Sequence, residues 1–399
     1  MTTAAVVVIG AGAFGASTAY HLARRGADVV LLDQHALGSQ TSPRAAGLTS
    51  KAATTPLMAR LRHEALERFE VEMGRPIGFH RSGSLKAAYS EAGEARLHAD
   101  LAVARGLGIE AEPIPAASAA RLAPHFVPGP ARAIGYVPSD GWLDPSGVAL
   151  GFAERAAELG ARAWPFTRVT EILRERGRVS GVVTTRGEIR APAVVDAAGA
   201  WAPRIAAESG IHLPLVPVRH QLFVTEPIAG VEPLQPVVRL LEASVYVRYE
   251  RGGLLFGGYE DAPRVVEPGS LKPGFAIDDL ELDLGVLRSL VDEVAARFPV
   301  LRTARVRELR GGLPTMTPDG YPLLGIVPGL EGFYVASGCC VGGLTLSPAA
   351  GRALADLILA GRSDPDLAPL SPARFAGRWA DPAELEAACV ARYARKYLK

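Results

Sequence analysis

Cysteine is scarce in this sequence: there are three in 399 residues, and two of them are neighbours, Cys339 and Cys340. Adjacent cysteines bridge each other only through a strained peptide, so we expect small, buried thiols and no disulfide framework. No group of histidines, cysteines and acids has the spacing of a metal site, and no G-x-S-x-G elbow is present. We therefore expect no metal and no serine-hydrolase chemistry.

The sequence also lacks an excess of charge and lacks long apolar runs. Lys plus Arg total 43 and Asp plus Glu total 42, so no overall field favours nucleic acid or an anionic membrane as partner. Apolar runs such as residues 6–9 and 29–32 are far too short to span a bilayer. The N-terminus has neither a basic region nor a small-residue cleavage site, and we expect a cytoplasmic protein.

The start of the chain carries the pattern of a dinucleotide-binding unit. An apolar strand at residues 6–9 leads into glycines at the G-x-G-x-x-G spacing, and a second apolar strand ends in an acid. The glycines are Gly10, Gly12 and Gly15, and the acid is Asp33. In such a unit the glycines allow a tight turn, an approach to pyrophosphate and close helix packing, and the acid binds a ribose hydroxyl. The alternative is a glycine-rich turn in an ordinary α/β protein.

Junctions at which a strand runs through glycine into a helix recur later in the chain. The strand at 193–196 is followed by Gly199, and the strand at 332–338 by a helix expected at 347–359. A strand-rich segment separates them, which predicts a doubly wound α/β nucleotide-binding domain with an interleaved, β-rich substrate domain. The expected ranges are 1–85, 145–215 and 320–365 for the first domain, 86–144 and 216–319 for the second, and 366–399 for a C-terminal extension.

Four further motifs accompany the first one along nearly the whole chain. They are Gly38-Ser39 with Ala45-Ala46-Gly47-Leu48, Val195-Asp-Ala-Ala-Gly199-Ala-Trp201, Met316-Thr-Pro-Asp319-Gly-Tyr-Pro-Leu-Leu-Gly325, and Gly338 with Gly342-Gly343-Leu-Thr345. Together they resemble the FAD-dependent amine oxidoreductases of the D-amino-acid-oxidase superfamily, which includes sarcosine oxidases, glycine oxidase and dimethylglycine dehydrogenases. The resemblance implies an FAD cofactor.

The dinucleotide pattern and the resemblance together assign a set of residues to the FAD. They are Gly10, Gly12, Phe14, Gly15, Asp33, Gln34, Ser39, Arg44, Ala46, Gly47, Val169, Ala198, Gly199, Trp201, Met316, Gly338, Gly342, Gly343, Leu344 and Thr345. In the family the loop that contains the last of these faces the flavin. Its N–H groups are expected where reduction of the flavin places negative charge.

Within the superfamily the sequence is most similar to the dimethylglycine dehydrogenase and oxidase branch. A His-Gln pair precedes a Thr-Glu-Pro segment at 218–227, and a Gly-Gly-Tyr-Glu segment follows at 257–260. The corresponding His and Tyr of that branch lie at the substrate, which implies this role for His220 and Tyr259. A histidine with a pKa near 6.5 can accept or relay a proton at cellular pH. For each residue a structural role is the alternative.

Tyr246 and Arg248 lie two residues apart in an expected strand and should therefore point to one face. A guanidinium matches a carboxylate bidentately, so the sequence predicts Arg248 as a clamp for the substrate carboxylate, next to Tyr246. The alternative is an exposed arginine in a salt bridge.

The sequence departs from the family pattern at positions that bear on the flavin. The branch attaches FAD covalently through a histidine in the small-residue loop, where this sequence has Arg44, a residue that could instead neutralise charge on flavin or substrate. Sarcosine oxidases use a cysteine where this sequence reads Gly311-Gly-Leu-Pro-Thr, and a carboxylate-binding lysine at the position of Thr345. We therefore expect a non-covalent flavin.

The reaction implied is oxidation of a small secondary or tertiary, N-methylated amino acid by hydride transfer to FAD, followed by hydrolysis of the imine or iminium. Oxygen or another acceptor would reoxidise the flavin, and a folate-binding half is not expected. A D-amino-acid or cyclic, proline-like imino-acid dehydrogenase is one alternative, which Thr345 favours. A flavin-binding subunit that requires a partner chain and an NAD-dependent enzyme are the others.

Overall fold

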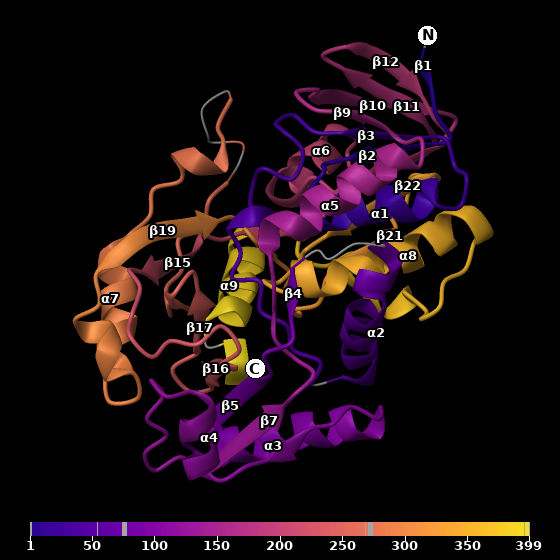
Figure 1. Ribbon diagram of the computed structural model, residues 1–399. Helices are drawn as coiled ribbons and strands as arrows, with labels where there is room; N and C mark the ends of the chain where they lie inside the picture. The colour runs from indigo at the N-terminus through magenta and orange to yellow at the C-terminus, as the bar shows by residue number, and fades with distance from the viewer. Residues whose placement is uncertain are drawn as a thin grey trace.

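The computed structural model describes residues 2–53, 55–73, 78–267, 269, 274–394 and 396–398. Its upper part in Figure 1 contains a six-stranded sheet in the order β21-β22-β13-β2-β3-β9. Neighbouring strands are parallel, except that β21 runs antiparallel to β22. The strands are β2 (Val6–Ile9), β3 (Val29–Leu32), β9 (Arg162–Trp164), β13 (Ala193–Asp196), β21 (Leu323–Ile326) and β22 (Phe333–Ser337).

The central strands of this sheet are apolar on both faces because both faces are covered. Val6 and Val8 pack against a layer of helices. Val7 and Ile9 face a smaller sheet, of order β1-β12-β11-β10, and one further helix. The helices of the layer are α1 (Ala13–Ala23), α2 (Pro56–Met73), α5 (Pro145–Glu158) and α8 (Gly343–Ala360). The opposite face has β1 (Thr2–Thr3), β10 (Val169–Glu175), β11 (Arg178–Thr184), β12 (Gly187–Arg190) and α6 (Ala202–Glu208).

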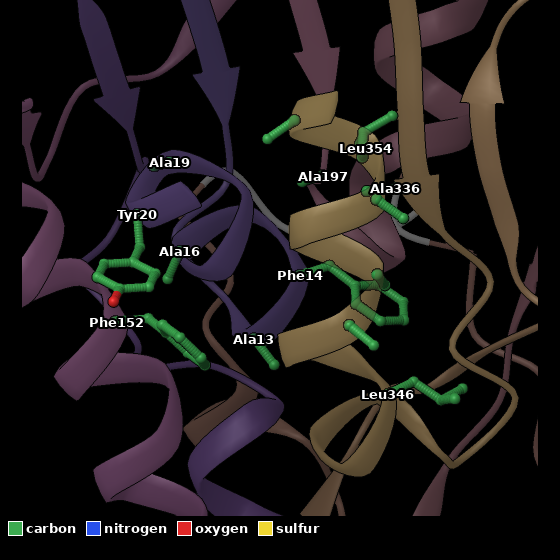
Figure 2. Close-up of a cluster of buried hydrophobic side chains, with 14 of the residues drawn as sticks. Ala13, Phe14, Ala16, Ala19, Tyr20, Phe152, Ala197, Ala336, Leu346 and Leu354 are labelled. Carbon is green, nitrogen blue, oxygen red and sulfur yellow. The ribbon is translucent and has the colours of Figure 1, made fainter. Parts of the chain in front are cut away.

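Helix α1 lies in the middle of the helical layer, and all of its residues are buried. Figure 2 shows Tyr20 of α1 beside Phe152 of α5, with ring centroids 5.4 Å apart, and Phe14 against α8. A Cβ on Gly351 of α8 would lie 2.3 Å from the Ser17 Oγ, so a glycine is needed where the two helices cross. This packing fixes the N-terminal end of α1, where the glycine motif lies.

The lower part of the molecule contains an eight-stranded sheet of order β19-β15-β18-β17-β16-β5-β7-β6 (Figure 1). Strands β5 and β16 are parallel neighbours, which joins an early and a late segment of the chain into one sheet. The strands are β5 (Ser84–Ala88), β6 (Glu112–Pro113), β7 (Ala133–Val137), β15 (His220–Thr225), β16 (Val237–Leu240), β17 (Val245–Glu250), β18 (Gly253–Gly258) and β19 (Val306–Gly312). Helices α3 (Glu91–Gly106), α4 (Ala116–Leu122) and α7 (Leu284–Glu293) lie around it.

Helix α9 (Pro382–Tyr393) lies between the two parts of the molecule (Figure 1). It contacts a pair of short strands, β14 (Val216–Pro217) and β20 (Thr315–Met316). A second short pair is β4 (Phe79–His80) with β8 (Trp142–Leu143). Side chains of α9 belong to one buried cluster with residues of β17 and β20. A short turn of helix at Lys396–Leu398 follows. The last segment of the chain is therefore part of the core.

The structure confirms the predicted α/β class with an additional β-rich part, whereas the domain boundaries stay a prediction. The helix expected at 347–359 was placed too late, because α8 begins at Gly343 and its first turn contains residues that were read as loop. Cys339, Cys340 and Cys389 are free thiols, and the last two are buried. None of the described helices is long and apolar enough to cross a membrane.

Candidate active site

A cavity of about 610 Å³ is lined both by the glycine turn after β2 and by side chains of the eight-stranded sheet. It therefore joins the predicted nucleotide-binding motif to the residues expected at the substrate. Its walls also include the loop at 38–48, the first turn of α8 and the C-terminal residues Arg392, Lys396 and Tyr397.

The glycine motif is built by close approach of backbone atoms. Gly10 has a φ of +97°, and a Cβ there would lie 2.5 Å from the carbonyl oxygen of Ala197. A Cβ on Gly15 would lie 1.9 Å from the carbonyl oxygen of Gly10, so helix and turn could not approach as they do. Gly12 lines the cavity and is the N-cap of α1, whose first N–H groups have no partner within the helix. The tight turn at Gly10 and the close helix packing at Gly15 are as the motif predicts, whereas the approach of Gly12 to a pyrophosphate stays a prediction.

Asp33 fixes its carboxylate in the cavity wall at the end of β3. One carboxylate oxygen accepts the N–H of Ala11 and the other accepts the N–H of His35, both at 2.8 Å. Burial raises the pKa of this carboxyl. A hydroxyl donor in the cavity would oppose that shift, because it stabilises the ionised form. The glycine cradle, the helix N-terminus and this acid together fit an FAD.

The loop before α8 has an unusual backbone. Cys340 and Val341 have φ values of 43° and 61°, a region that residues with side chains rarely adopt. Such strain tends to occur at functional sites. It brings Gly342 and the first turn of α8 into the cavity wall, so that the positive end of the helix dipole faces the cavity. The side chain of Thr345 donates a hydrogen bond to the carbonyl of Leu48 at 2.9 Å.

One row of residues crosses the eight-stranded sheet at the cavity. Arg239 of β16 is paired in register with Lys86 of β5 on one side and with Tyr246 of β17 on the other. Tyr246 is paired in turn with Gly257 of β18. All but the glycine line the cavity, as side chains on one rung of a sheet share a face.

His220 lies between two phenols. Its Nδ1 is 2.7 Å from the Tyr393 hydroxyl and its Nε2 is 2.8 Å from the Tyr246 hydroxyl. The Tyr259 ring lies 5.0 Å from the imidazole, centroid to centroid, and is also close to Tyr397. Burial, followed by the nearby Lys396 charge, lowers the pKa of His220 to about 3. The imidazole is therefore neutral at cellular pH, and one ring nitrogen donates while the other accepts.

The glycine opposite Tyr246 gives its ring the space to reach His220. A Cβ on Gly257 would lie 2.3 Å from the Tyr246 hydroxyl oxygen. We predict that Gly257→Ala displaces this phenol and lowers the rate of flavin reduction roughly tenfold, the order of a lost orienting contact. The FAD content of the purified variant should be unchanged, because Gly257 is remote from the glycine cradle. Anaerobic stopped-flow absorbance measures the rate of flavin reduction and the FAD content. A normal rate of reduction would show that Gly257 is not needed to place the Tyr246 ring.

Cationic side chains gather at the same end of the cavity. Lys86 donates to Asp100 at 3.0 Å, and Arg239 donates to the carbonyl of Thr49 at 2.8 Å while its other terminal nitrogen is buried without a partner. Arg62 and Lys396 line the cavity as well. Burial lowers the pKa of Arg62, Lys86 and Lys396, in each case as the largest cause.

The structure brings most of the predicted FAD residues and three of the four predicted substrate residues to this cavity. The lining residues among them are Gly10, Gly12, Phe14, Asp33, Gln34, Ser39, Arg44, Ala46, Gly47, Val169, Ala198, Gly199, Trp201, Gly342, Gly343, Leu344, Thr345, His220, Tyr246 and Tyr259. Those that do not line it are Gly15, Met316, Gly338 and Arg248. Met316 is fully buried in the cluster with α9. Arg44 donates to the Gln40 carbonyl and pairs with Asp278, so it fastens its own loop.

Arg248 is not placed to clamp a substrate carboxylate, in contrast to the sequence prediction. Its guanidinium pairs with Glu250 at 2.7 Å, donates to the Ala46 carbonyl at 2.7 Å and lies 4.4 Å from the Trp142 ring centroid. Although Tyr246 and Arg248 are two residues apart in β17, only Tyr246 reaches the cavity. Arg239, on the neighbouring strand, does line the cavity.

Sequence reasoning missed the cations and the C-terminal phenols. A lone arginine inside the apolar run Val237–Leu240 was an available signal for Arg239. Nothing in the local sequence of Tyr393, Lys396 and Tyr397 indicates that they lie opposite β15 and β18, because this proximity depends on the path of α9. Among the described residues, no group of three or more His, Cys, Asp or Glu side chains could hold a metal.

Comparison with known proteins agrees with this geometry. Mouse mitochondrial dimethylglycine dehydrogenase is 32% identical over 388 residues, which cover 94% of this chain and 44% of that protein. Human mitochondrial sarcosine dehydrogenase is 33% identical over 384 residues, which cover 94% of this chain and 42% of that protein. The chain thus spans less than half the length of these curated relatives.

The crystal structure of L-proline dehydrogenase from P. horikoshii superposes with a TM-score of 0.85 at 26% identity, covering 94% of this chain and 98% of that one. Residues 5–357 match the family DAO, described as FAD dependent oxidoreductase. Such a cofactor removes the NAD-dependent alternative. The chain belongs to the DAO family of FAD-dependent oxidoreductases.

Proposed function

We propose that this chain uses FAD to oxidise a small secondary or tertiary, N-methylated amino acid at a carbon next to the nitrogen. One observation carries the proposal: a single cavity connects the glycine cradle and Asp33 with a pocket of phenols and cations. The curated relatives named above act, by their names, on dimethylglycine and sarcosine. The flavin would be held without a covalent bond, since Arg44 stands in the loop where the resembling branch has its histidine.

The cationic side chains bind and orient the substrate. Arg239 offers a buried, unpartnered guanidinium nitrogen, to which a carboxylate can bind as a charge-assisted acceptor. The phenols of Tyr246 and Tyr259 line the same pocket, and burial holds their pKa values well above 10, so both stay neutral donors. When bound, FAD supplies the acceptor for two electrons and the hydrogen of the substrate carbon.

The positive field of the pocket also sets the protonation of the amine. Arg62, Arg239 and Lys396 disfavour a further positive charge, so they lower the pKa of a bound ammonium group and favour the neutral amine. A neutral amine has the free electron pair that oxidation requires. His220 does not take up this proton near neutral pH, because its pKa is about 3. Its role is to hold the phenols of Tyr246 and Tyr393 in place.

This assignment predicts the pH dependence of flavin reduction. As the pH falls, the rate of flavin reduction should decline with the pKa of the substrate amine and not with the pKa of His220. The pKa of this histidine, about 3, lies far below the working pH range. We expect His220→Gln to slow reduction about tenfold and to leave the midpoint of that decline in place. Substrates with amines of different basicity should shift the midpoint. A decline that vanishes in His220→Gln would contradict the assignment.

Oxidation of a cyclic imino acid is the second candidate, favoured by the similarity in fold to L-proline dehydrogenase. Product analysis separates the two functions. An N-methylated amino acid that loses its methyl group releases formaldehyde, whereas a proline-like substrate gives a cyclic imine and no formaldehyde. Anaerobic bleaching of the flavin, screened across N-methylated amino acids, D-amino acids and proline analogues, tests both. Bleaching by D-amino acids alone would overturn the first proposal.

Purification of the single chain tests the cofactor and the need for a partner. The protein should show flavin absorption in the blue, and acid precipitation should leave the flavin in the supernatant. Reduction of this flavin by an amine, with no other protein present, would show that no partner subunit is required. A flavin that stays with the precipitated protein would contradict non-covalent binding.

A further inference from the structure

The substrate end of the cavity holds more positive charge than one carboxylate can balance. Among the described residues, no carboxylate lies within ion-pair distance of Arg62, Arg239 or Lys396. Lys86 and Arg96 share the single carboxylate of Asp100, at 3.0 and 3.1 Å.

The other carboxylate that acts on this group is Asp140. It is fully buried, and it accepts the backbone N–H of Lys51 at 2.9 Å and the Ser84 hydroxyl at 2.6 Å. The phenols that line the pocket add no negative charge, because burial keeps them protonated. Among the described residues, the cations Arg62, Lys86, Arg239 and Lys396 therefore face the carboxylates of Asp100 and Asp140.

The fold also places like charges directly opposite each other. Lys86 and Arg239 are register partners on neighbouring strands, an arrangement that destabilises a sheet. Burial without enough counter-charge is reflected in the lowered pKa values of Arg62, Lys86 and Lys396. Buried charges are costly unless they are paired. A bound anion is the group that would pair them.

The cations come from separate elements that face one another across the cavity. Arg239 and Lys86 project from the sheet, Arg62 from α2, and Lys396 from the turn after α9. Arg62 acts electrostatically on Lys396 and is itself acted on by Arg239. One anionic group at Arg239 leaves Arg62 and Lys396 without a partner, so the cavity offers a second anion position.

We infer that the substrate carries two carboxylates, one bound at Arg239 and the other at Lys396 and Arg62. The inference rests on the proposed function, and it narrows the substrate class to secondary or tertiary amines of dicarboxylic acids. Lys396 then determines specificity: it selects the second carboxylate and touches none of the reacting atoms.

Matched pairs of amines, in which a carboxamide replaces the second carboxylate, test the inference. The pairs are N-(carboxymethyl)glycine with N-(carbamoylmethyl)glycine, N-methyl-L-aspartate with N-methyl-L-asparagine, and N-methyl-L-glutamate with N-methyl-L-glutamine. Anaerobic titration of the FAD-loaded chain gives a Kd for each compound from the flavin spectrum. In at least one pair we expect the acid to bind about 10- to 100-fold more tightly than its amide, as a charge-assisted bond in a buried site allows. A ratio below about tenfold in every pair overturns the inference.

Two variants show whether Lys396 is a residue that binds the second carboxylate. Lys396→Met removes the charge and keeps the chain length, so the preference for the acid over its amide should fall about tenfold, while the contact of the second carboxylate with Arg62 remains. Lys396→Arg should retain the preference for the acid. An unchanged ratio in Lys396→Met overturns the assignment to Lys396.

The outcome also separates this inference from the proposed function. If N-methylglycine reduces the flavin and none of the dicarboxylic amines does, the inference is wrong and the proposed function stands. If no amine reduces the flavin, the proposed function is wrong and the inference falls with it.

Discussion

Replacing Arg239 with methionine is expected to raise the Kd of the amino-acid substrate about 10- to 100-fold, with the FAD content unchanged. The guanidinium is buried, donates one bond to the Thr49 carbonyl and has a second nitrogen without a partner in the cavity wall. A charge-assisted bond to a carboxylate in such a site contributes about 1.5–3 kcal/mol, which is roughly a factor of 10 to 100. Anaerobic titration of the flavin absorbance measures the Kd and the FAD content together.

Arg248→Met is the matched control, because it removes a buried arginine that does not line the cavity. Arg248 pairs with Glu250 and donates to the carbonyl of Ala46, a residue of the cavity wall. Its loss removes the ion pair at 2.7 Å and the packing of the guanidinium on the Trp142 ring, while Glu250 keeps Arg310 as a partner at 3.0 Å. We therefore expect a lower Tm and a substrate Kd within a few-fold of the unmodified chain. A substrate effect larger in Arg248→Met than in Arg239→Met would restore the sequence-based assignment.

The contrast between these two arginines shows what the sequence could predict. The glycine motif was predictable because its function depends on backbone spacing, which a short stretch of sequence specifies. Strand alternation placed Tyr246 and Arg248 on one face of a strand, and the structure has Tyr246 in the cavity wall, whereas its role at the substrate stays a prediction. Arg248 and its partner Glu250 follow Tyr246 at spacings of two along the same face of β17, but Arg248 pairs with Glu250 and donates to the Ala46 carbonyl instead of lining the cavity. Alternation predicts a face and not the partner that an arginine finds.

The cationic pocket could not be predicted from local patterns, because it is made by contacts between distant segments. Lys86 and Arg239 become neighbours only through the parallel pairing of β5 with β16. Tyr393 reaches His220, 173 positions away in sequence, only because α9 returns between the two large sheets. Tertiary packing brings these residues together, and no single sequence motif contains the information that they will be in contact.

Substitutions in the glycine cradle are expected to have the largest effect on the affinity for FAD. A series of three glycine-to-alanine variants separates helix packing from contact with the cofactor. In Gly15→Ala the new Cβ would lie 1.9 Å from the Gly10 carbonyl oxygen and 3.0 Å from the Ala197 Cβ, so α1 must move away from the turn. We expect the Tm to fall, as overpacking costs about 1–3 kcal/mol. The affinity for FAD should fall by about 100-fold or more, because a displacement near 1 Å has effects of this size.

Gly12→Ala and Gly106→Ala complete the series. A Cβ on Gly12 would lie 3.3 Å from the Ser42 Oγ, in the wall where the pyrophosphate is expected, so this variant should lose FAD affinity with little change in the Tm of the FAD-free protein. Gly106, at the end of α3, has open space around its Cβ position. Its replacement by alanine should leave the affinity for FAD unchanged and should change the Tm only by the small gain in helix propensity. Titration with FAD and thermal unfolding of the FAD-free proteins measure the two effects. A Gly15→Ala protein that binds FAD normally would show that the approach of α1 to the turn is not what forms the cradle.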